Sequence, residues 1–121
     1  MEKLVLENQN LRLEFDSQTG AMVGLTAKAT GWEVLNRSSL GLSYRLLVPL
    51  PQKRNNPVHG EKQVLSRAEV GADGQSLSLA WDKVTSERGG EHEIRVQLTV
   101  TLTEDQARFA VEIENNSEYT V

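Results

Sequence analysis

The stretch EHEIRVQLTVTLTEDQARFAVEIENN, residues 91–116, decides the fold, because its apolar residues recur at every second position. In its first half, polar side chains alternate with an apolar row formed by Ile94, Val96, Leu98, Val100 and Leu102. A β-strand places successive side chains on opposite faces, whereas on a helix these residues would scatter around the axis. The first half therefore predicts a strand with one buried face and one solvated face.

The second half of the stretch repeats the alternation. Its inward row is expected to consist of Ala107, Phe109, Val111 and Ile113. The polar residues TEDQ between the two halves, at 103–106, favour a turn. We therefore expect an antiparallel hairpin over residues 92–115, with both apolar rows facing the core.

The same two-residue period runs through the rest of the chain. It predicts strands at residues 4–6, 11–15, 21–25, 32–35 and 44–48, and a second hairpin that joins 62–70 to 76–84 across the turn dipeptide Asp73-Gly74. The segment 49–62 is expected to form a long exposed loop. No window carries a helical stripe, and turn signals recur roughly every ten residues. The sequence predicts an all-β fold, an antiparallel β-sandwich of roughly eight or nine strands.

The length and composition of the chain indicate a single globular domain and exclude cysteine chemistry. The chain has 121 residues, of which 38% are hydrophobic and 25% charged, with a formal net charge of −4 and no cysteine. A single domain over residues 1–121 is expected at this length. The absence of cysteine excludes disulfides, thiolate catalysis and cysteine-based zinc sites.

Charge and hydropathy patterning bear on partners and location. No run reaches the ~20 apolar residues of a membrane span, and the start MEKLVLENQN lacks the apolar core of a signal peptide. Basic residues do not cluster, apart from the adjacent pair Lys53 and Arg54. We therefore expect no membrane and no nucleic acid as partner, and a cytoplasmic location.

The chain contains residue types that catalyse reactions in other proteins, but they do not form a known catalytic motif. There is no GxSxG elbow, and His59 and His92 are expected to be solvated surface imidazoles. Most carboxylates fall on the wet side of predicted strands; Glu33 is the exception, since it stands between Trp32 and Leu35. We expect no catalytic residue, no metal site and no cofactor.

The aromatic residues divide into core and candidate binding residues. Phe15, Phe109 and Trp81 follow the inward register and are expected in the core. A flat aromatic ring beside amide, guanidinium and carboxylate groups is typical of sugar binding, because the ring covers the apolar face of the sugar. The candidate carbohydrate-binding residues are therefore Trp32, Glu33, Asn36, Arg37, Tyr44 and His59.

The opening residues 6–36, LENQNLRLEFDSQTGAMVGLTAKATGWEVLN, resemble the start of the galactose mutarotase-like β-supersandwich domain. The matching elements are Leu6 to Asn8, the alternating strand that ends at Asp16, Thr19-Gly20, and Gly31 to Leu35. The closing VEIENNSEYTV, residues 111–121, fits the same pattern. Members of the family usually need about twice this length, and their catalytic His and Glu motifs have no counterpart here. No catalytic residue is therefore carried over.

This resemblance implies a carbohydrate-active context. It favours a non-catalytic accessory domain, the N-terminal part of a longer glycoside hydrolase-like protein, with carbohydrate and a catalytic domain of the same chain as its partners. One alternative is a free-standing aldose 1-epimerase-like enzyme that pairs Glu33 or Glu112 with His59 or His92. The other is a protein-interaction module, such as a homodimer joined through an unpaired sheet edge.

Overall fold

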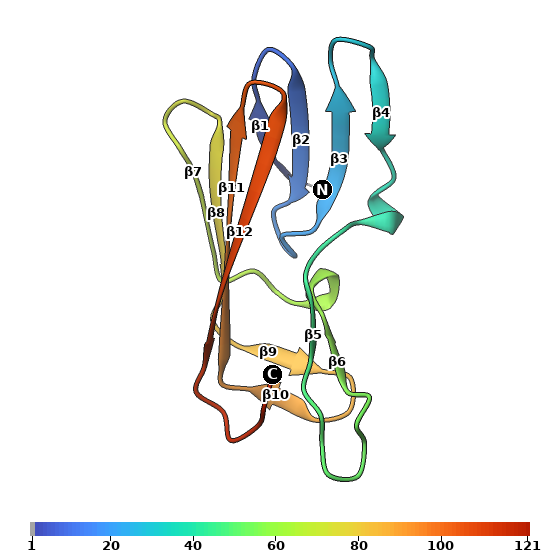
Figure 1. Cartoon of the computed structure of the whole chain (residues 1–121), viewed down its shortest axis with the longest axis vertical. Helices are drawn as coiled ribbons and strands as arrows, with labels where there is room; N and C mark the ends of the chain where they lie inside the picture. The colour runs from blue at the N-terminus through green and yellow to red at the C-terminus, as the bar shows by residue number, and fades with distance from the viewer. Residues whose placement is uncertain (1) are drawn as a thin grey trace.

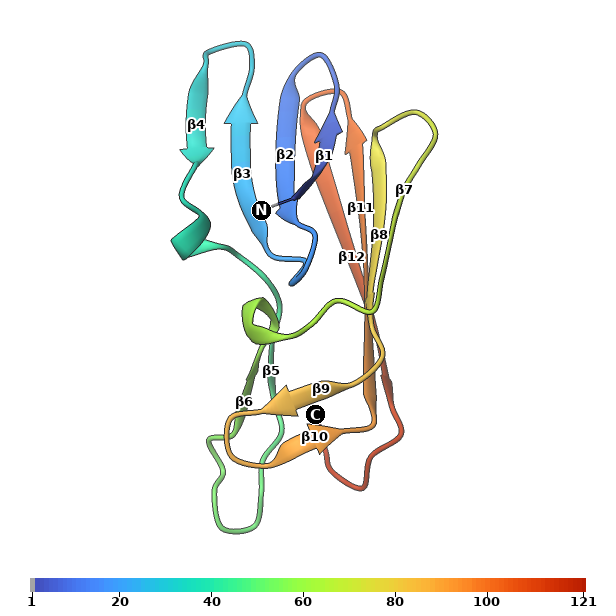
Figure 2. The ribbon, with the colours of Figure 1, turned by 180° about the vertical axis from the view of Figure 1, so that it is seen from behind.

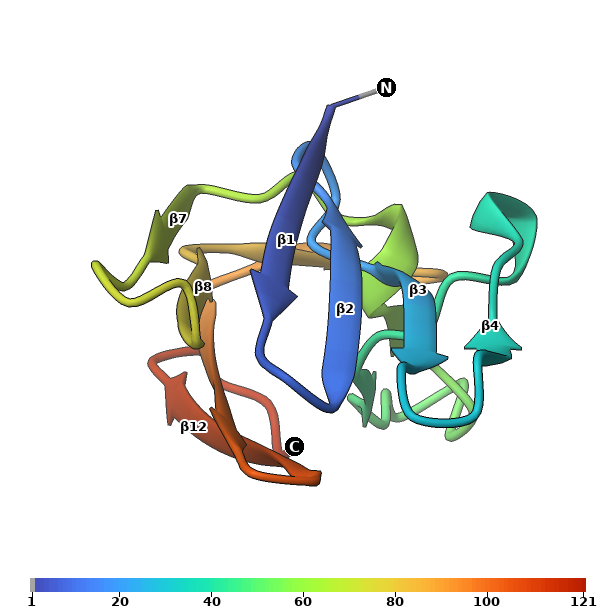
Figure 3. The same ribbon diagram turned by 90° about the horizontal axis from the view of Figure 1, so that it is seen from above.

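The computed structural model describes residues 2–121, which form twelve β-strands and two short 3-10 helices. Two four-stranded antiparallel sheets face each other as layers (Figures 1 and 3). The N-terminal sheet has the order β1 (Lys3–Glu7), β2 (Leu11–Asp16), β3 (Met22–Ala27) and β4 (Trp32–Leu35). The C-terminal sheet has the order β12 (Gln106–Asn115), β11 (Ile94–Thr103), β8 (Ser76–Trp81) and β7 (Arg67–Val70).

Two short antiparallel pairs lie at the other end of the molecule (Figure 2). One pairs β5 (Arg45–Leu47) with β6 (Pro57–His59), and the other pairs β9 (Val84–Ser86) with β10 (Gly90–His92). The helices η1 (Ser38–Leu40) and η2 (Gly60–Lys62) follow β4 and β6. The predicted all-β class is confirmed. The strand number exceeds the expected eight or nine because three-residue strands form where loops and turns were expected, as with β6 inside segment 49–62.

The predicted hairpin over residues 92–115 is confirmed. Strands β11 and β12 pair in continuous register from Ile94 opposite Asn115 to Thr103 opposite Gln106. The two residues between them make the turn, and Glu104 takes a positive φ of 53° there. The hairpin of β7 and β8 across Asp73-Gly74 is confirmed as well.

One core fills the space between the sheets. It includes Leu6, Leu13 and Phe15 from the N-terminal sheet, and the rows of β8 and β11 from the C-terminal sheet. The predicted core position of Trp81 is confirmed, since its ring is fully buried. Its indole Nε1 donates to the Thr19 carbonyl at 3.1 Å, so this side chain ties the two sheets together.

The turn before β3 is built around this tryptophan. Gly20 has a φ of +76°, and a Cβ atom there would lie 2.5 Å from the Trp81 ring. Any other residue would meet both a strained backbone and a clash. The sequence signal of a Gly-containing turn at this point therefore also marks a close approach between the sheets.

The predicted strand at residues 21–25 forms as β3, but its alternation is interrupted. A register shift between Glu14 and Phe15 puts Leu25 opposite Leu13 and Met22 opposite Phe15, so these residues share the core face. Val23 is buried instead against the segment around Gly41. An extra residue in one strand reverses the alternation after it, which a strict two-residue period does not anticipate.

The predicted burial of the β12 row is also wrong. Phe109 is 47% exposed, Val111 50% and Ile113 43%, although they share a face with the buried row of β11. The pattern predicted the face correctly, but no strand of the N-terminal sheet covers this edge.

Candidate interaction surface

Strand β12 is the outermost strand of the C-terminal sheet and has ten residues. Direct register across the sheet places Phe109 opposite the buried Val100, and Val111 opposite Leu98. The apolar row of the core therefore continues onto β12 and becomes exposed there. We call the row of Ala107, Phe109, Val111 and Ile113, with its free backbone, the β12 edge.

The backbone of the β12 edge points away from the rest of the sheet. The Leu102 N–H donates to the Gln75 carbonyl on the β8 side at 2.8 Å, and the Asn116 N–H donates to Glu93 on the β11 side at 2.9 Å. Hydrogen-bonding direction alternates along a strand. The N–H and C=O groups of the odd-numbered residues 107–113 therefore face outward, in line with the exposed apolar row.

The outer face of β12 carries charge. Arg108 lies opposite Thr101 and Glu112 opposite Gln97, so their cross-strand neighbours within the sheet are neutral. Neither Arg108 nor Glu112 forms an ion pair with any residue from 2 to 121. An edge strand that is long and apolar on one face is a template for another strand, and natural proteins usually protect such edges with proline, bulges or lysine.

The other exposed strand edges are shorter or differently built. At the far side of the C-terminal sheet, β7 has four residues and ends at Val70, which is 39% exposed. Strand β1 has five residues, and its Glu7 N–H donates to the Gly74 carbonyl at 3.2 Å. The β12 edge therefore offers the longest free row of backbone groups.

Four of the sequence-predicted sugar-binding residues lie on or just after β4. Trp32 is 66% exposed and lies on the core side of the sheet, because it pairs with Ala27, which pairs with Leu11. Glu33 accepts a hydrogen bond from Asn36 at 2.6 Å. Arg37 precedes η1 and is exposed. Glu33 pairs with Thr26, which pairs with Arg12 on the outer side, so the Trp32 ring and the Glu33 carboxylate point to opposite faces of the sheet.

The other two predicted residues, Tyr44 and His59, lie around β5 and β6. Tyr44 packs edge-on against Trp81, with ring centroids 4.8 Å apart. Burial raises the pKa of Tyr44, with a smaller contribution from Glu61, and no residue of the described chain bonds its hydroxyl. His59 lies 3.3 Å from Glu87 and 3.7 Å from Glu61. Among residues 2–121, no hydrogen bond, ion pair or ring contact joins either residue to Trp32, so the six do not form one cluster.

His92 is buried, which corrects the expectation of a solvated imidazole. Its Nε2 lies 2.7 Å from the Ser86 hydroxyl. That hydroxyl already accepts from Asn56 Nδ2 and from the Gly89 N–H, both at 2.9 Å. These two accepted bonds use both lone pairs of the hydroxyl oxygen. The Ser86 hydroxyl therefore donates its hydrogen to His92 Nε2, which accepts.

Both side chains of this serine–histidine pair are only 4% exposed, so the pair is closed off from a substrate. Asn56 extends the network, donating to the Val48 carbonyl and accepting from the Arg88 N–H. The network therefore holds the β9–β10 hairpin against the segment between β5 and β6. Little in the sequence indicates this network, because Asn56 and Ser86 are 30 positions apart.

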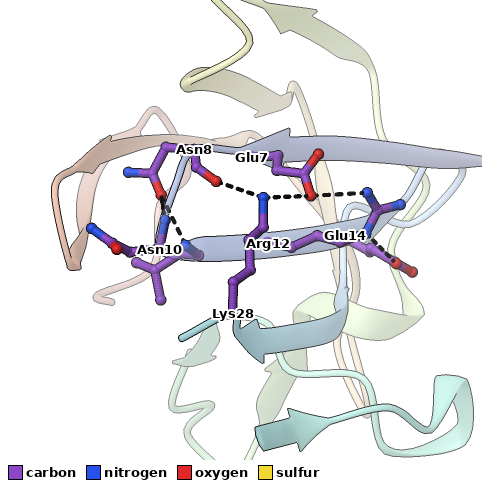
Figure 4. A network of polar contacts seen from close by, with 7 residues as sticks. Glu7, Asn8, Asn10, Arg12, Glu14 and Lys28 are labelled. Carbon is purple, nitrogen blue, oxygen red and sulfur yellow. Dashed lines mark hydrogen bonds and ion pairs between the residues drawn. The ribbon is translucent and has the colours of Figure 1, made fainter. Parts of the chain in front are cut away.

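Ion pairs cover the outer face of the N-terminal sheet (Figure 4). Lys3 and Arg12 contact Glu14 at 2.8 and 3.1 Å, and Arg12 and Lys28 contact Glu7 at 3.4 and 3.3 Å. Hydrogen bonds from Lys3 and then Arg12 hold the pKa of Glu14 below its usual range. Hydrogen bonds from Lys28 and, to a smaller extent, from Arg12 lower the pKa of Glu7. Three cations share two carboxylates, and each of the five side chains contacts an opposite charge, so the cluster stabilises cross-strand pairing.

Asn8 lies in the β1–β2 turn, next to this cluster of ion pairs (Figure 4). Its side-chain oxygen accepts from the Asn10 and Leu11 N–H groups, both at 2.8 Å, which shapes the β1–β2 turn. Its Nδ2 donates to the Glu104 carbonyl at 2.8 Å. The turn of the N-terminal sheet is thereby fastened to the turn of the β11–β12 hairpin.

The residues of the epimerase-like alternative are not brought together. Among residues 2–121, no contact joins Glu33 or Glu112 to His59 or His92. The described part of the chain contains no group of three or more His, Asp or Glu arranged to hold a metal ion. It also contains no helix long and apolar enough to cross a lipid bilayer.

Comparisons with known proteins return no relative of this chain. No family model, no curated protein and no solved structure matches it.

Proposed function

We propose that this chain is a protein-interaction module that receives a partner β-strand along the β12 edge. One observation supports the proposal. Strand β12 has exposed apolar side chains, and the backbone N–H and C=O groups of the same residues point outward without a partner strand. A strand docked there would complete the hydrogen-bond ladder and cover part of Phe109, Val111 and Ile113. Main-chain bonds give such a complex its affinity, and the alternate side chains give it specificity.

A synthetic peptide of residues 106–115 is the direct probe of this edge. We expect saturable binding that protects the amides of Phe109, Val111 and Ile113 from hydrogen exchange, measured by NMR. The substitution Val111→Pro removes one outward N–H without removing a bond to β11, so it should abolish docking while the fold is retained.

The matched control is Val70→Pro on β7. Gly71 donates its N–H to the Ser76 carbonyl at 2.8 Å, so the Val70 N–H faces away from β8. Peptide docking should survive this change. A peptide that leaves the β12 amides unprotected, or that still binds Val111→Pro, would contradict the proposal.

The exposed indole on β4 favours a second candidate function, contact with carbohydrate as an accessory domain of a glycoside hydrolase-like protein. Trp32 presents a largely free ring at the edge of the N-terminal sheet. Calorimetric titration with oligosaccharides of different linkage tests it: binding that Trp32→Ala removes would support sugar contact. The matched control is Trp32→Phe, which keeps a flat ring and should retain part of the affinity.

A further inference from the structure

The direction of the free backbone groups limits how any strand can join the β12 edge. Only the odd-numbered residues offer outward N–H and C=O groups, so two copies of β12 bond each other only where odd residues face odd residues. In an antiparallel pair of identical strands, this requires a two-fold axis that passes through a residue position. The two registers with the longest overlap have the axis at Ala110 or at Val111.

The axis at Ala110 gives a self-complementary pair. It places Arg108 of one copy opposite Glu112 of the other, and symmetry repeats this contact. It also places Phe109 opposite Val111, and Ala107 opposite Ile113. Opposite charges and apolar pairs directly across antiparallel strands both stabilise a sheet.

Within a single chain these two charges cannot neutralise each other. Arg108 and Glu112 are four positions apart on one strand, which separates them by about 13 Å. Their cross-strand neighbours are Thr101 and Gln97. A second copy supplies the missing opposite charge to both at once.

The axis at Val111 is less favourable. It places Arg108 opposite Glu114 and leaves Glu112 opposite Ala110. Glu114 already has Arg95 as its cross-strand neighbour on β11. Moving the axis one position further, to Glu112, would set two identical carboxylates face to face, which destabilises pairing.

We infer that the partner of the β12 edge is a second copy of this chain, joined antiparallel about a two-fold axis at Ala110. The inference rests on the proposed function of that edge. The axis is perpendicular to the sheet, so both copies keep their apolar rows on the same side. The row from Val100 through Phe109 then continues into Val111 and Leu98 of the second copy, in one sheet of eight strands.

Charge reversal tests this register. Arg108→Glu sets two carboxylates against each other across the axis, and Glu112→Arg sets two guanidinium groups against each other. We expect sedimentation equilibrium to show a concentration-dependent dimer for the unmodified chain. Each single variant should raise its dissociation constant about ten- to a hundredfold.

The two single variants are complementary to each other. An equimolar mixture should form a heterodimer with near-original affinity, which native mass spectrometry identifies by its mass. The double variant Arg108→Glu/Glu112→Arg should dimerise with itself. Glu69→Arg, on the opposite edge strand, is the matched control and should leave the dimer unchanged. Circular dichroism checks that each variant keeps its strand signal.

Three results would overturn the inference. A monomer at millimolar concentration that still binds the 106–115 peptide would exclude the second copy and leave the docking edge intact. Absence of both dimer and peptide binding would overturn the proposed function together with the inference. Weakening by Glu114→Arg but not by Glu112→Arg would place the axis at Val111 instead.

Discussion

Strands β11 and β12 form one hairpin with the same alternating pattern, and they differ in what covers them. The apolar row of β11 is buried, with Ile94, Val96 and Val100 fully inaccessible, whereas Phe109, Val111 and Ile113 on β12 are about half exposed. The two rows share one face of one sheet. Alternation therefore determines which side of a strand is apolar, and the extent of the opposite sheet determines whether that side is buried.

The N-terminal sheet shows the same contrast between its centre and its edge. Leu13 and Phe15 on β2 are buried, while Trp32 on β4 is largely exposed on the same side of the sheet. The described chain thus has apolar residues on the facing sides of both sheets that the core does not use. Substitutions at matched central and edge positions test this difference.

The largest effect is expected from a charge on the central row. Val100→Asp buries a carboxylate among apolar side chains and should cost more than about 4 kcal/mol, enough to abolish folding. Val111→Asp on β12 leaves its carboxylate in contact with water and should cost within about 1 kcal/mol. Urea denaturation followed by circular dichroism, at concentrations where the chain is monomeric, compares the two. Equal loss of folding in both variants would show that β12 is covered.

The two tryptophans extend the comparison to the other sheet. Trp81→Ala removes a fully buried ring and its hydrogen bond to Thr19, and should cost about 3–5 kcal/mol. Trp32→Ala removes an exposed ring and should change the free energy of unfolding within about 0.5 kcal/mol. Thermal unfolding midpoints measure both. A large loss from Trp32→Ala would mean that the β4 edge packs against something.

The smallest effect concerns the charged outer faces. Ion pairs lower the pKa of Glu14 in the folded chain, so its contribution is present above its unfolded pKa of about 4.3 and is lost as pH falls through the folded pKa. Glu14→Gln should therefore make stability less dependent on pH below about 4.3, with a cost at pH 7 under about 1 kcal/mol. Denaturation between pH 2 and pH 7 measures the slope. Glu112→Gln removes a carboxylate that forms no ion pair within residues 2–121 and is the control; an equal change in both variants would contradict the argument.

Much of the fold was predictable because it depends on local pattern. The two-residue period predicted the all-β class. The turn residues at 103–106 and at Asp73-Gly74 predicted the turns of two hairpins, and the structure has turns at both places. The bulge at Val23 in β3, opposite Glu14 and Phe15, was not predictable in this way, because one extra residue leaves no mark in the alternation itself.

The candidate surface was only partly predictable. The polar face of β11 carries one charge, Arg95, among Gln97 and three threonines, whereas that of β12 carries Arg108, Glu112 and Glu114. Charge on the polar face is one of the features by which edge strands differ from central ones. This signal was available in the sequence and would have indicated that β12 is an edge. The burial of His92 left no such signal, because its partner Ser86 and the asparagine beyond it come together only through the pairing of β9 and β10.

The sequence by itself determined that this chain forms strands, which side of each strand is apolar and where the principal hairpins turn. These properties depend on neighbouring residues and on the geometry of an extended backbone. Only the tertiary structure decided that β11 is buried and β12 is free. Burial depends on whether the opposite sheet reaches a strand, and that reach follows from contacts between residues far apart in the chain.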